Sequence, residues 1–172
     1  MLAFFAFQTF SRVLGLLLAG AFVLWAAPTP AQAGEVGAFK NDWTGNEIVV
    51  EAIADPKVQG VTCHLVHFER SVIDRLSKGH WFQDPSNSSI DCQRTGPLTI
   101  GAIRTDAAGE DVFSERASLV FKSIAVRRIY DKANETLVYI AYSRQVKDAS
   151  AKVSVTTVPL AGQSVTWSQG HP

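Results

Sequence analysis

The 172-residue sequence predicts an all-β domain: a single antiparallel sandwich or partly closed barrel with one short helix. The chain contains about six or seven short runs with strand patterns, separated by turn-forming residues. Only one stretch has a helical pattern. A sandwich or barrel follows because every strand must bury one of its faces. An α+β arrangement is the alternative.

The first strand signals come early in the chain. Residues 47–55 are rich in β-branched side chains and stop at Pro56, and residues 60–70 alternate between apolar and polar side chains. Residues 88–94 form a shorter run, and the Thr-Gly-Pro at 95–97 is typical of a turn. We therefore expect three short strands in this half of the chain.

The helical stretch covers residues 71–79. Ser71 is a suitable N-cap, Asp74 follows three residues later, and Gly79 is a suitable end. A short apolar face is formed by Val72, Ile73 and Leu76. The pattern predicts a helix of about two turns.

Further strand signals fill the second half. Residues 98–104 form a fourth run. Residues 118–131 and 136–143 flank a cluster of turn-forming residues, which predicts a long antiparallel hairpin. Residues 152–158 alternate well and stop at Pro159.

The N-terminus has the layout of a cleavable secretory signal over residues 1–33. Arg12 is its only charge, residues 13–27 are all apolar, and Ala31 with Ala33 forms an A-x-A cleavage site. A bilayer-spanning helix needs about 20 apolar residues, so the shorter run favours cleavage over a retained anchor. After cleavage we expect no stable membrane span.

The remaining chain suits one β domain over residues 34–160. The small and polar residues 161–172 predict a flexible tail. Loss of Arg12 leaves 15 cations against 16 anions, a net charge of −1. This balance argues against a nucleic-acid partner.

Both cysteines, Cys63 and Cys92, lie in the part that would be exported. Two thiols in an oxidising compartment are expected to pair. The alternative is a redox-active pair, but the separation is far from C-x-x-C. The sequence therefore favours a structural disulfide.

Residues 118–131 are strongly apolar and yet carry Lys122, Arg127 and Arg128. On a strand, Lys122 and Arg128 share one face about 20 Å apart, whereas Arg127 lies on the other. The three cations therefore do not form one small anion site. Either their aliphatic stems lie on apolar neighbours with the charges in water, or an arginine makes a fork-type ion pair near Tyr130 and Asp131.

Several ordered blocks of the sequence resemble the CreA family of exported bacterial proteins. The blocks are IVVEA, DPKVQGVTC, IDCQRTGPL, SLVFKSIAVRRIYD and YIAYS, and the resemblance covers about residues 35–160. Cys63 and Cys92 fall on the two cysteines of the family. The resemblance implies a small periplasmic protein of Gram-negative bacteria. The family has no assigned enzymatic activity, so the resemblance supplies no mechanism.

The strand motif of the family maps onto Lys122, Arg128, Tyr130 and Asp131. Arg127 departs from it, because that position is more often apolar in the family. The family also commonly has a glycine-rich segment between its cysteines, whereas residues 69–83 contain only Gly79. A family role that depends on backbone contacts of that segment is therefore in doubt here.

No catalytic motif is present, so we assign no catalytic residues and expect no metal or cofactor. His64 and His67 would face opposite sides of a strand and would not share a metal ion. Trp81 and Phe82 lie side by side in a polar loop. Either they contact a partner, or one ring fills the end of the core.

The first functional hypothesis is a non-enzymatic periplasmic module that binds a periplasmic protein or an envelope component through an edge or loop. The alternative is an enzyme with an unrecognised site near Arg128, Tyr130 and Asp131. The sequence leaves the oligomeric state open. The candidate binding residues are Trp81, Phe82, Lys122, Arg128, Tyr130 and Asp131.

Overall fold

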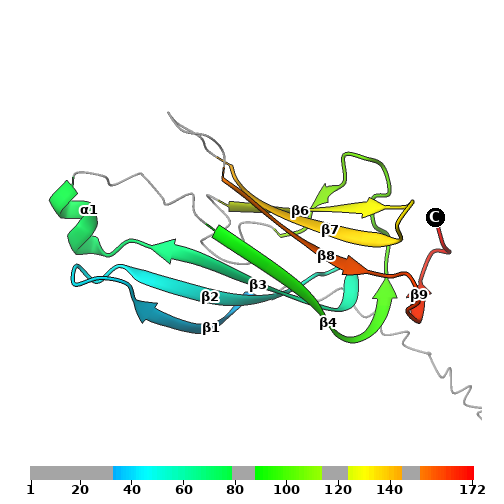
Figure 1. The fold of residues 1–172 in the computed structure, drawn as a ribbon, viewed down its shortest axis with the longest axis horizontal. Helices are drawn as coiled ribbons and strands as arrows, with labels where there is room; N and C mark the ends of the chain where they lie inside the picture. Colours follow the sequence, from blue (N-terminus) through cyan, green and yellow to red (C-terminus); the bar gives the residue numbers. More distant parts are fainter. Residues whose placement is uncertain (1–32, 79–87, 114–123, 145–151) are drawn as a thin grey trace, which may run out of the picture.

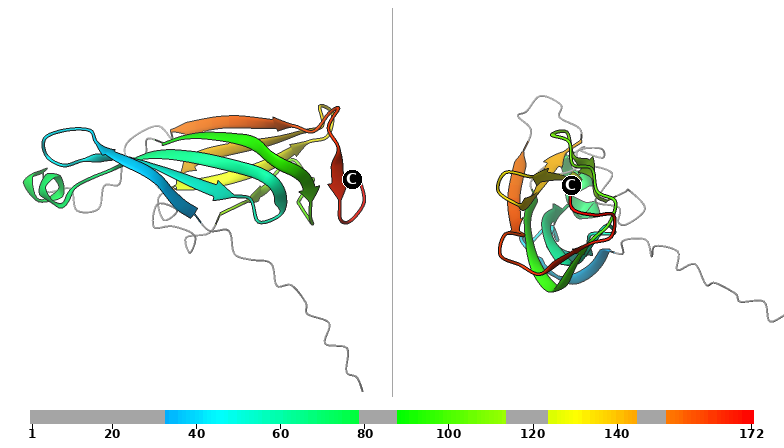
Figure 2. Two further views of the ribbon diagram at one scale, coloured as in Figure 1. Left: turned by 90° about the horizontal axis from the view of Figure 1, so that it is seen from below. Right: turned by 90° about the vertical axis from the view of Figure 1, so that its right-hand side faces the viewer.

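The computed structural model describes residues 33–78, 88–113, 124–144 and 152–172. These segments form two β-sheets packed face to face, with a short helix at one end of the molecule (Figure 1). The predicted all-β sandwich is confirmed, and its two sheets stay separate instead of closing into one barrel. Figure 2 shows the layers from two further directions.

The first sheet has the strand order β1-β2-β3-β4-β9, and the second has the order β5-β6-β7-β8. Neighbouring strands are antiparallel except β4 and β9, which are parallel. The elements are β1 (Ala33–Lys40), β2 (Glu47–Ala54), β3 (Val58–Glu69), α1 (Val72–Lys78), β4 (Ser88–Ile100), β5 (Glu110–Asp111), β6 (Ile124–Asp131), β7 (Thr136–Ser143), β8 (Val153–Pro159) and β9 (Val165–Trp167).

The core lies between the two sheets and is built by strand alternation. In β3, Val61, Cys63 and Leu65 are buried while the residues between them are half-buried. Ile124 and Val126 of β6 join the same apolar cluster from the second sheet. Burial of each such aliphatic side chain contributes about 1.5–3 kcal/mol, so this alternation is the main source of the fold's stability.

The predicted turn at residues 95–97 is wrong, because β4 runs through it without a break. The pairing of β3 with β4 shifts register at this point, between Gln59 and Val61. Gly60 has a φ of 82°, and a Cβ there would lie 2.3 Å from the carbonyl oxygen of Pro97. Residues 95–97 therefore mark a bulge in β4 and not a turn. The opposite strand, β3, needs a glycine at position 60 because a side chain there would collide with Pro97.

The predicted hairpin and helix are both found. β6 and β7 pair from Ile124 with Ser143 to Asp131 with Thr136. The first part of that predicted run, residues 118–123, lies outside the described residues. At the start of α1, the backbone N–H of Asp74 donates to Ser71 Oγ at 3.1 Å, which is the expected N-cap.

Three strands were absent from the sequence-based prediction: β1, β5 and β9. β9 lies within residues 161–172, for which the composition predicts a flexible tail. It pairs with Leu98–Ile100 of β4, and the Trp167 ring packs against Tyr130 with ring centroids 5.5 Å apart. The contact of Trp167 with the core residue Tyr130 explains why β9 has a defined position against the sandwich.

The sandwich is closed along one side by hydroxyl groups of β8. Ser154 Oγ accepts a hydrogen bond from the Ile90 N–H at 3.1 Å, and Thr156 Oγ1 accepts one from the Cys92 N–H at 3.2 Å. These side chains satisfy backbone donors of β4 that would otherwise lie at a sheet edge. The opposite edge of the first sheet is β1.

Candidate functional site

The predicted disulfide joins Cys63 to Cys92. The two residues lie directly opposite each other in the pairing of β3 with β4. Both are almost fully buried in the core. A buried bridge is out of reach of an external thiolate, so its position supports a structural role over a redox-active one.

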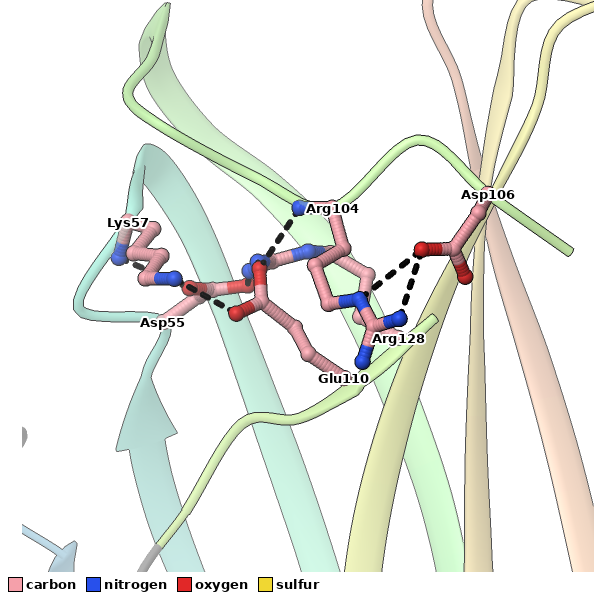
Figure 3. A network of polar contacts seen from close by, with 6 residues as sticks. All are labelled: Asp55, Lys57, Arg104, Asp106, Glu110 and Arg128. Carbon is pink, nitrogen blue, oxygen red and sulfur yellow. Dashed lines mark hydrogen bonds and ion pairs between the residues drawn. The ribbon is translucent and has the colours of Figure 1, made fainter. Parts of the chain in front are cut away.

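Arg128 is the centre of a buried ionic network between the sheets (Figure 3). Its side chain is only 1% exposed, and it projects inward from β6. One guanidinium nitrogen donates to Asp55 Oδ2, and another donates to Glu110 Oε1 at 2.5 Å. Burial lowers the pKa of Arg128, but the charge of Asp55, its hydrogen bond and the charge of Glu110 together outweigh burial and raise the pKa.

Asp55 lies in the turn between β2 and β3, two strands of the first sheet. Its carboxylate accepts the Tyr139 hydroxyl at 2.8 Å and the backbone N–H of Lys57 at 2.8 Å. Burial raises the pKa of Tyr139, so its hydroxyl stays protonated and acts as a donor. With Arg128, these contacts link the β2–β3 turn to β6 and β7 of the second sheet.

Glu110 is the partly exposed carboxylate of the network, and Figure 3 shows it between Lys57 and Arg128. It accepts from Lys57 Nζ at 2.5 Å and from the backbone N–H of Arg104 at 3.0 Å. Burial raises the pKa of Glu110, but these hydrogen bonds and the charge of Arg128 outweigh it. The pKa therefore lies below its ordinary value of 4.5.

This pKa shift predicts a loss of stability in acid. A carboxyl whose pKa is lowered by folding contributes stability above its unfolded pKa, and that contribution disappears as the pH falls through the folded value. We expect the urea concentration at the unfolding midpoint to decrease as the pH drops below about 4.5. In a Glu110→Gln variant this decrease should be less steep. Equal slopes for the two proteins would contradict this assignment.

The network is suited to holding the sheets together. Two carboxylates and two cations pair with one another, and the guanidinium is shielded from solvent. Removing one partner of such a buried pair would leave an uncompensated charge in the interior, so the pairing suits a structural role. Among the described residues, no group of three or more His, Cys, Asp or Glu side chains is arranged to hold a metal ion.

The structure separates the residues of the predicted strand motif. Arg128 and Tyr130 face inward, whereas the half-buried Asp131 caps the β6–β7 turn by accepting the Ala133 and Asn134 N–H groups at 3.1 and 3.2 Å. An ion pair of Arg128 is found, with Asp55 and Glu110 as partners and not Asp131. The other three candidate binding residues, Trp81, Phe82 and Lys122, lie outside the described residues.

Arg127, on the opposite face of β6, pairs with Asp111 at 2.9 Å and is partly exposed. Its position matches the half-solvated arrangement that the sequence allows for this strand. The neighbouring arginines of the apolar run thus have different environments, because strand alternation sends one inward and one outward.

A second candidate site lies at the end of the sandwich that carries α1. Large apolar side chains are exposed on β1, on the β1–β2 loop and on α1. We call this surface the apolar tip; it comprises Phe39, Trp43, Val72, Ile73 and Leu76. Trp43 is 94% exposed, which is unusual for a side chain that gains so much by burial.

The loop that carries Trp43 is held by a dense set of hydrogen bonds. Asp42 accepts the Thr44 N–H and hydroxyl at 2.9 and 2.6 Å, and accepts the Asn46 side-chain amide at 2.7 Å. The Thr44 hydroxyl lowers the pKa of Asp42, so the carboxylate remains an acceptor. The loop therefore presents Trp43 on a fixed backbone.

The same loop is joined to α1. The Ser71 hydroxyl donates to the Thr44 carbonyl at 2.5 Å, and the Ser71 N–H donates to Asn46 Oδ1 at 2.9 Å. Figures 1 and 2 both place the β1–β2 loop and α1 at the same end of the molecule. The two segments of the chain that carry the apolar tip are thus joined by hydrogen bonds at this end of the molecule.

The fold and its buried features define a small, disulfide-linked β-sandwich protein. Within the described residues, no helix is long and apolar enough to cross a bilayer.

The chain belongs to the CreA family: the family described as CreA protein matches residues 36–163. Protein CreA of Escherichia coli strain K12 is 39% identical over 137 residues, which cover 76% of this chain and 85% of the relative. The CreA proteins of E. coli O6:H1 strain CFT073 and E. coli O157:H7 match with the same identity and coverage. No solved structure matches the chain significantly.

Proposed function

We propose that this CreA-family chain is an exported periplasmic protein that binds a periplasmic protein or an envelope component without catalysing a reaction. The observation that carries the proposal is the apolar tip, with Trp43 exposed on a loop fixed by hydrogen bonds. Exposed aromatic side chains on rigid loops are typical contact residues of binding proteins.

Export is supported by three features. Residues 1–33 have the layout of a secretory signal, and the disulfide is of the kind that persists in oxidising compartments. The E. coli relatives come from a Gram-negative bacterium, whose periplasm is such a compartment. β1 begins at Ala33, so cleavage after that residue would leave the rest of the strand in place.

Rigidity makes the tip a favourable contact surface. A partner that covers Trp43 would gain the free energy of apolar burial with little loss of loop entropy. Ser71 ties α1 to the loop, so Val72, Ile73 and Leu76 would be buried in the same event. Large aromatic side chains often provide most of the energy at such interfaces.

The absence of catalysis is supported by the ionic network. Arg128 lies in the region of the alternative enzymatic site, and its charge is paired with Asp55 and Glu110 inside the sandwich. Asp131, the other charged residue of that region, has its oxygens occupied in capping a turn. Both charges therefore have structural partners.

The test is affinity capture from an envelope extract of a Gram-negative bacterium. The exported protein is immobilised, and the captured components are compared between the parent and a Trp43→Ala/Leu76→Ala variant. We expect a component held by the parent to be retained at least about tenfold less by the variant, because hot-spot aromatics typically contribute 2 kcal/mol or more.

The matched control is Val153→Ala/Val155→Ala, which removes two exposed apolar side chains from β8. We expect the control to retain the component as the parent does. Capture that is equally strong with the tip variant and the parent would show that the apolar tip is not the contact surface. Turnover of a captured small molecule by the purified protein would contradict a non-enzymatic role.

A further inference from the structure

β1 is an open sheet edge. All of its residues from Gly34 to Lys40 are exposed, and among the described residues it pairs only with β2. The edges at β4 and β8 contact each other through Ser154 and Thr156, and β5 has only two residues. An exposed edge of eight residues is a ready template for pairing with another strand.

The inward-facing charges of β1 are arranged in an unusual way. Glu35 lies directly opposite Glu51 of β2, on the face that carries the buried Val49 and Ile53. Like charges directly opposite each other on a sheet are destabilising. Glu51 lies 3.9 Å from His67 of β3, whereas Glu35 has no cationic neighbour on β2, the strand it pairs with.

A cation on this face is found at the other end of the same strand. Lys40 lies opposite Glu47, which shares the inward face of β2 with Glu51. Glu35 and Lys40 are five positions apart and would normally face opposite sides. They share a face because the register shifts between Glu35 and Gly37, which makes Val36 the extra residue of a β-bulge.

We propose that two copies of this chain pair through β1, antiparallel and around a two-fold axis at Ala38. In this register Gly37 of each copy lies opposite Phe39 of the other. Because Val36 is the extra residue, Glu35 of each copy then lies opposite Lys40 of the other, on the same face. The two five-stranded sheets join into one continuous sheet.

This register is complementary in both charge and shape. Each Glu35 gains a cation that β2 of its own copy does not offer it, and the contact forms twice in a symmetric dimer. The position of a Cβ on Gly37 is open, with no atom within 4 Å. The exposed Phe39 ring of the other copy fits over it, as aromatic residues do over glycine in sheets.

The symmetry explains why the partner is a second copy. Glu35 and Lys40 lie on one face of β1, on either side of Ala38. They share that face because the bulge at Val36 adds one residue between them. A two-fold axis at Ala38 matches both charges at once. An unrelated strand would need its own matching pair of charges.

The first test exchanges the charges. The full chain, exported and processed by its host, is studied by sedimentation velocity over a range of concentrations. We expect a dimer for the parent, and a dissociation constant raised about tenfold or more for Glu35→Lys and for Lys40→Glu, because each substitution turns two attractive contacts repulsive. The double variant Glu35→Lys/Lys40→Glu should restore the parent's constant within about threefold.

The second test is a site-specific cross-link. Cysteine pairs directly opposite on antiparallel strands are close enough to form a disulfide. An Ala38→Cys variant is therefore expected to form a covalent dimer upon mild oxidation, whereas Val153→Cys, at an exposed side chain of β8, is the matched control. Thermal unfolding of each variant, compared with the parent, verifies that the fold is retained.

A parent protein that remains monomeric at every concentration overturns the proposal. So does a charge exchange that fails to restore the dimer, or Ala38→Cys cross-linking no better than Val153→Cys. The dimer contact shares only Phe39 with the apolar tip and does not involve Trp43 or α1, so Trp43→Ala is expected to leave the dissociation constant of the dimer unchanged. Loss of the dimer in that variant would place the interface at the tip and not at β1.

Discussion

Replacement of Arg128 by methionine is expected to lower the free energy of unfolding by about 3–5 kcal/mol. Methionine preserves much of the aliphatic stem but removes the charge that pairs with Asp55 and Glu110. Asp55 has a fully buried side chain, so its carboxylate would become an unpaired charge inside the sandwich. Urea unfolding followed by circular dichroism measures this loss.

Arg127 provides the matched control, because it lies next to Arg128 on the same strand. Its ion pair with Asp111 is partly exposed, and Arg127→Met is expected to change the free energy of unfolding by less than about 1 kcal/mol. If the two variants lost the same stability, the network around Arg128 would not hold the sheets together.

A double variant distinguishes the loss of an attraction from the cost of an unpaired charge. In Asp55→Leu/Arg128→Met both buried charges are absent, so much of the stability lost in Arg128→Met is expected to return. Recovery would show that the single variant suffers mainly from the buried Asp55 carboxylate. Tyr139 would still lose its acceptor, so the recovery is expected to be incomplete.

The fold was predictable where the pattern along the strand records the burial. β3 alternates in sequence as it does in the structure, and the β6–β7 hairpin was predicted from the turn-forming residues between its two apolar runs. β1 escaped prediction because its sequence, AGEVGAFK, contains two glycines and exposes nearly every side chain. Such a strand is specified by its pairing with β2, and a pairing between separate segments leaves no periodic signal in either one.

The site was predictable only in part for a related reason. Cations in an apolar run indicated that residues 118–131 were unusual, and alternation correctly separated Arg127 from Arg128. The partners of Arg128 are Asp55 and Glu110, which are 73 and 18 residues away. Sequence spacing carries no information about such contacts. Trp43 had a weak signal, an aromatic residue among turn-forming neighbours, but its exposure depends on the fold.

Removal of the disulfide is expected to lower the free energy of unfolding by about 3.6 kcal/mol. The bridge closes a loop with a sequence separation of 29 residues, and the chain-entropy model gives this value for a loop of that length. Because most domains are stable by only about 5–15 kcal/mol, a Cys63→Ala/Cys92→Ala variant should unfold at a clearly lower urea concentration.

The disulfide stabilises the protein mainly by restricting the unfolded chain. The folded sandwich of the variant should therefore resemble that of the parent. A reductant present during urea unfolding can reach the bridge once the chain opens, and it should shift the parent's urea midpoint toward that of the variant, because reduction opens the same loop. The variant itself has no thiols and serves as the control, since a reductant should leave its midpoint unchanged. Two free thiols in the exported parent, measured by mass spectrometry, would contradict the bridge. A reduced parent with an unaltered midpoint would instead show that strand pairing alone holds β3 to β4.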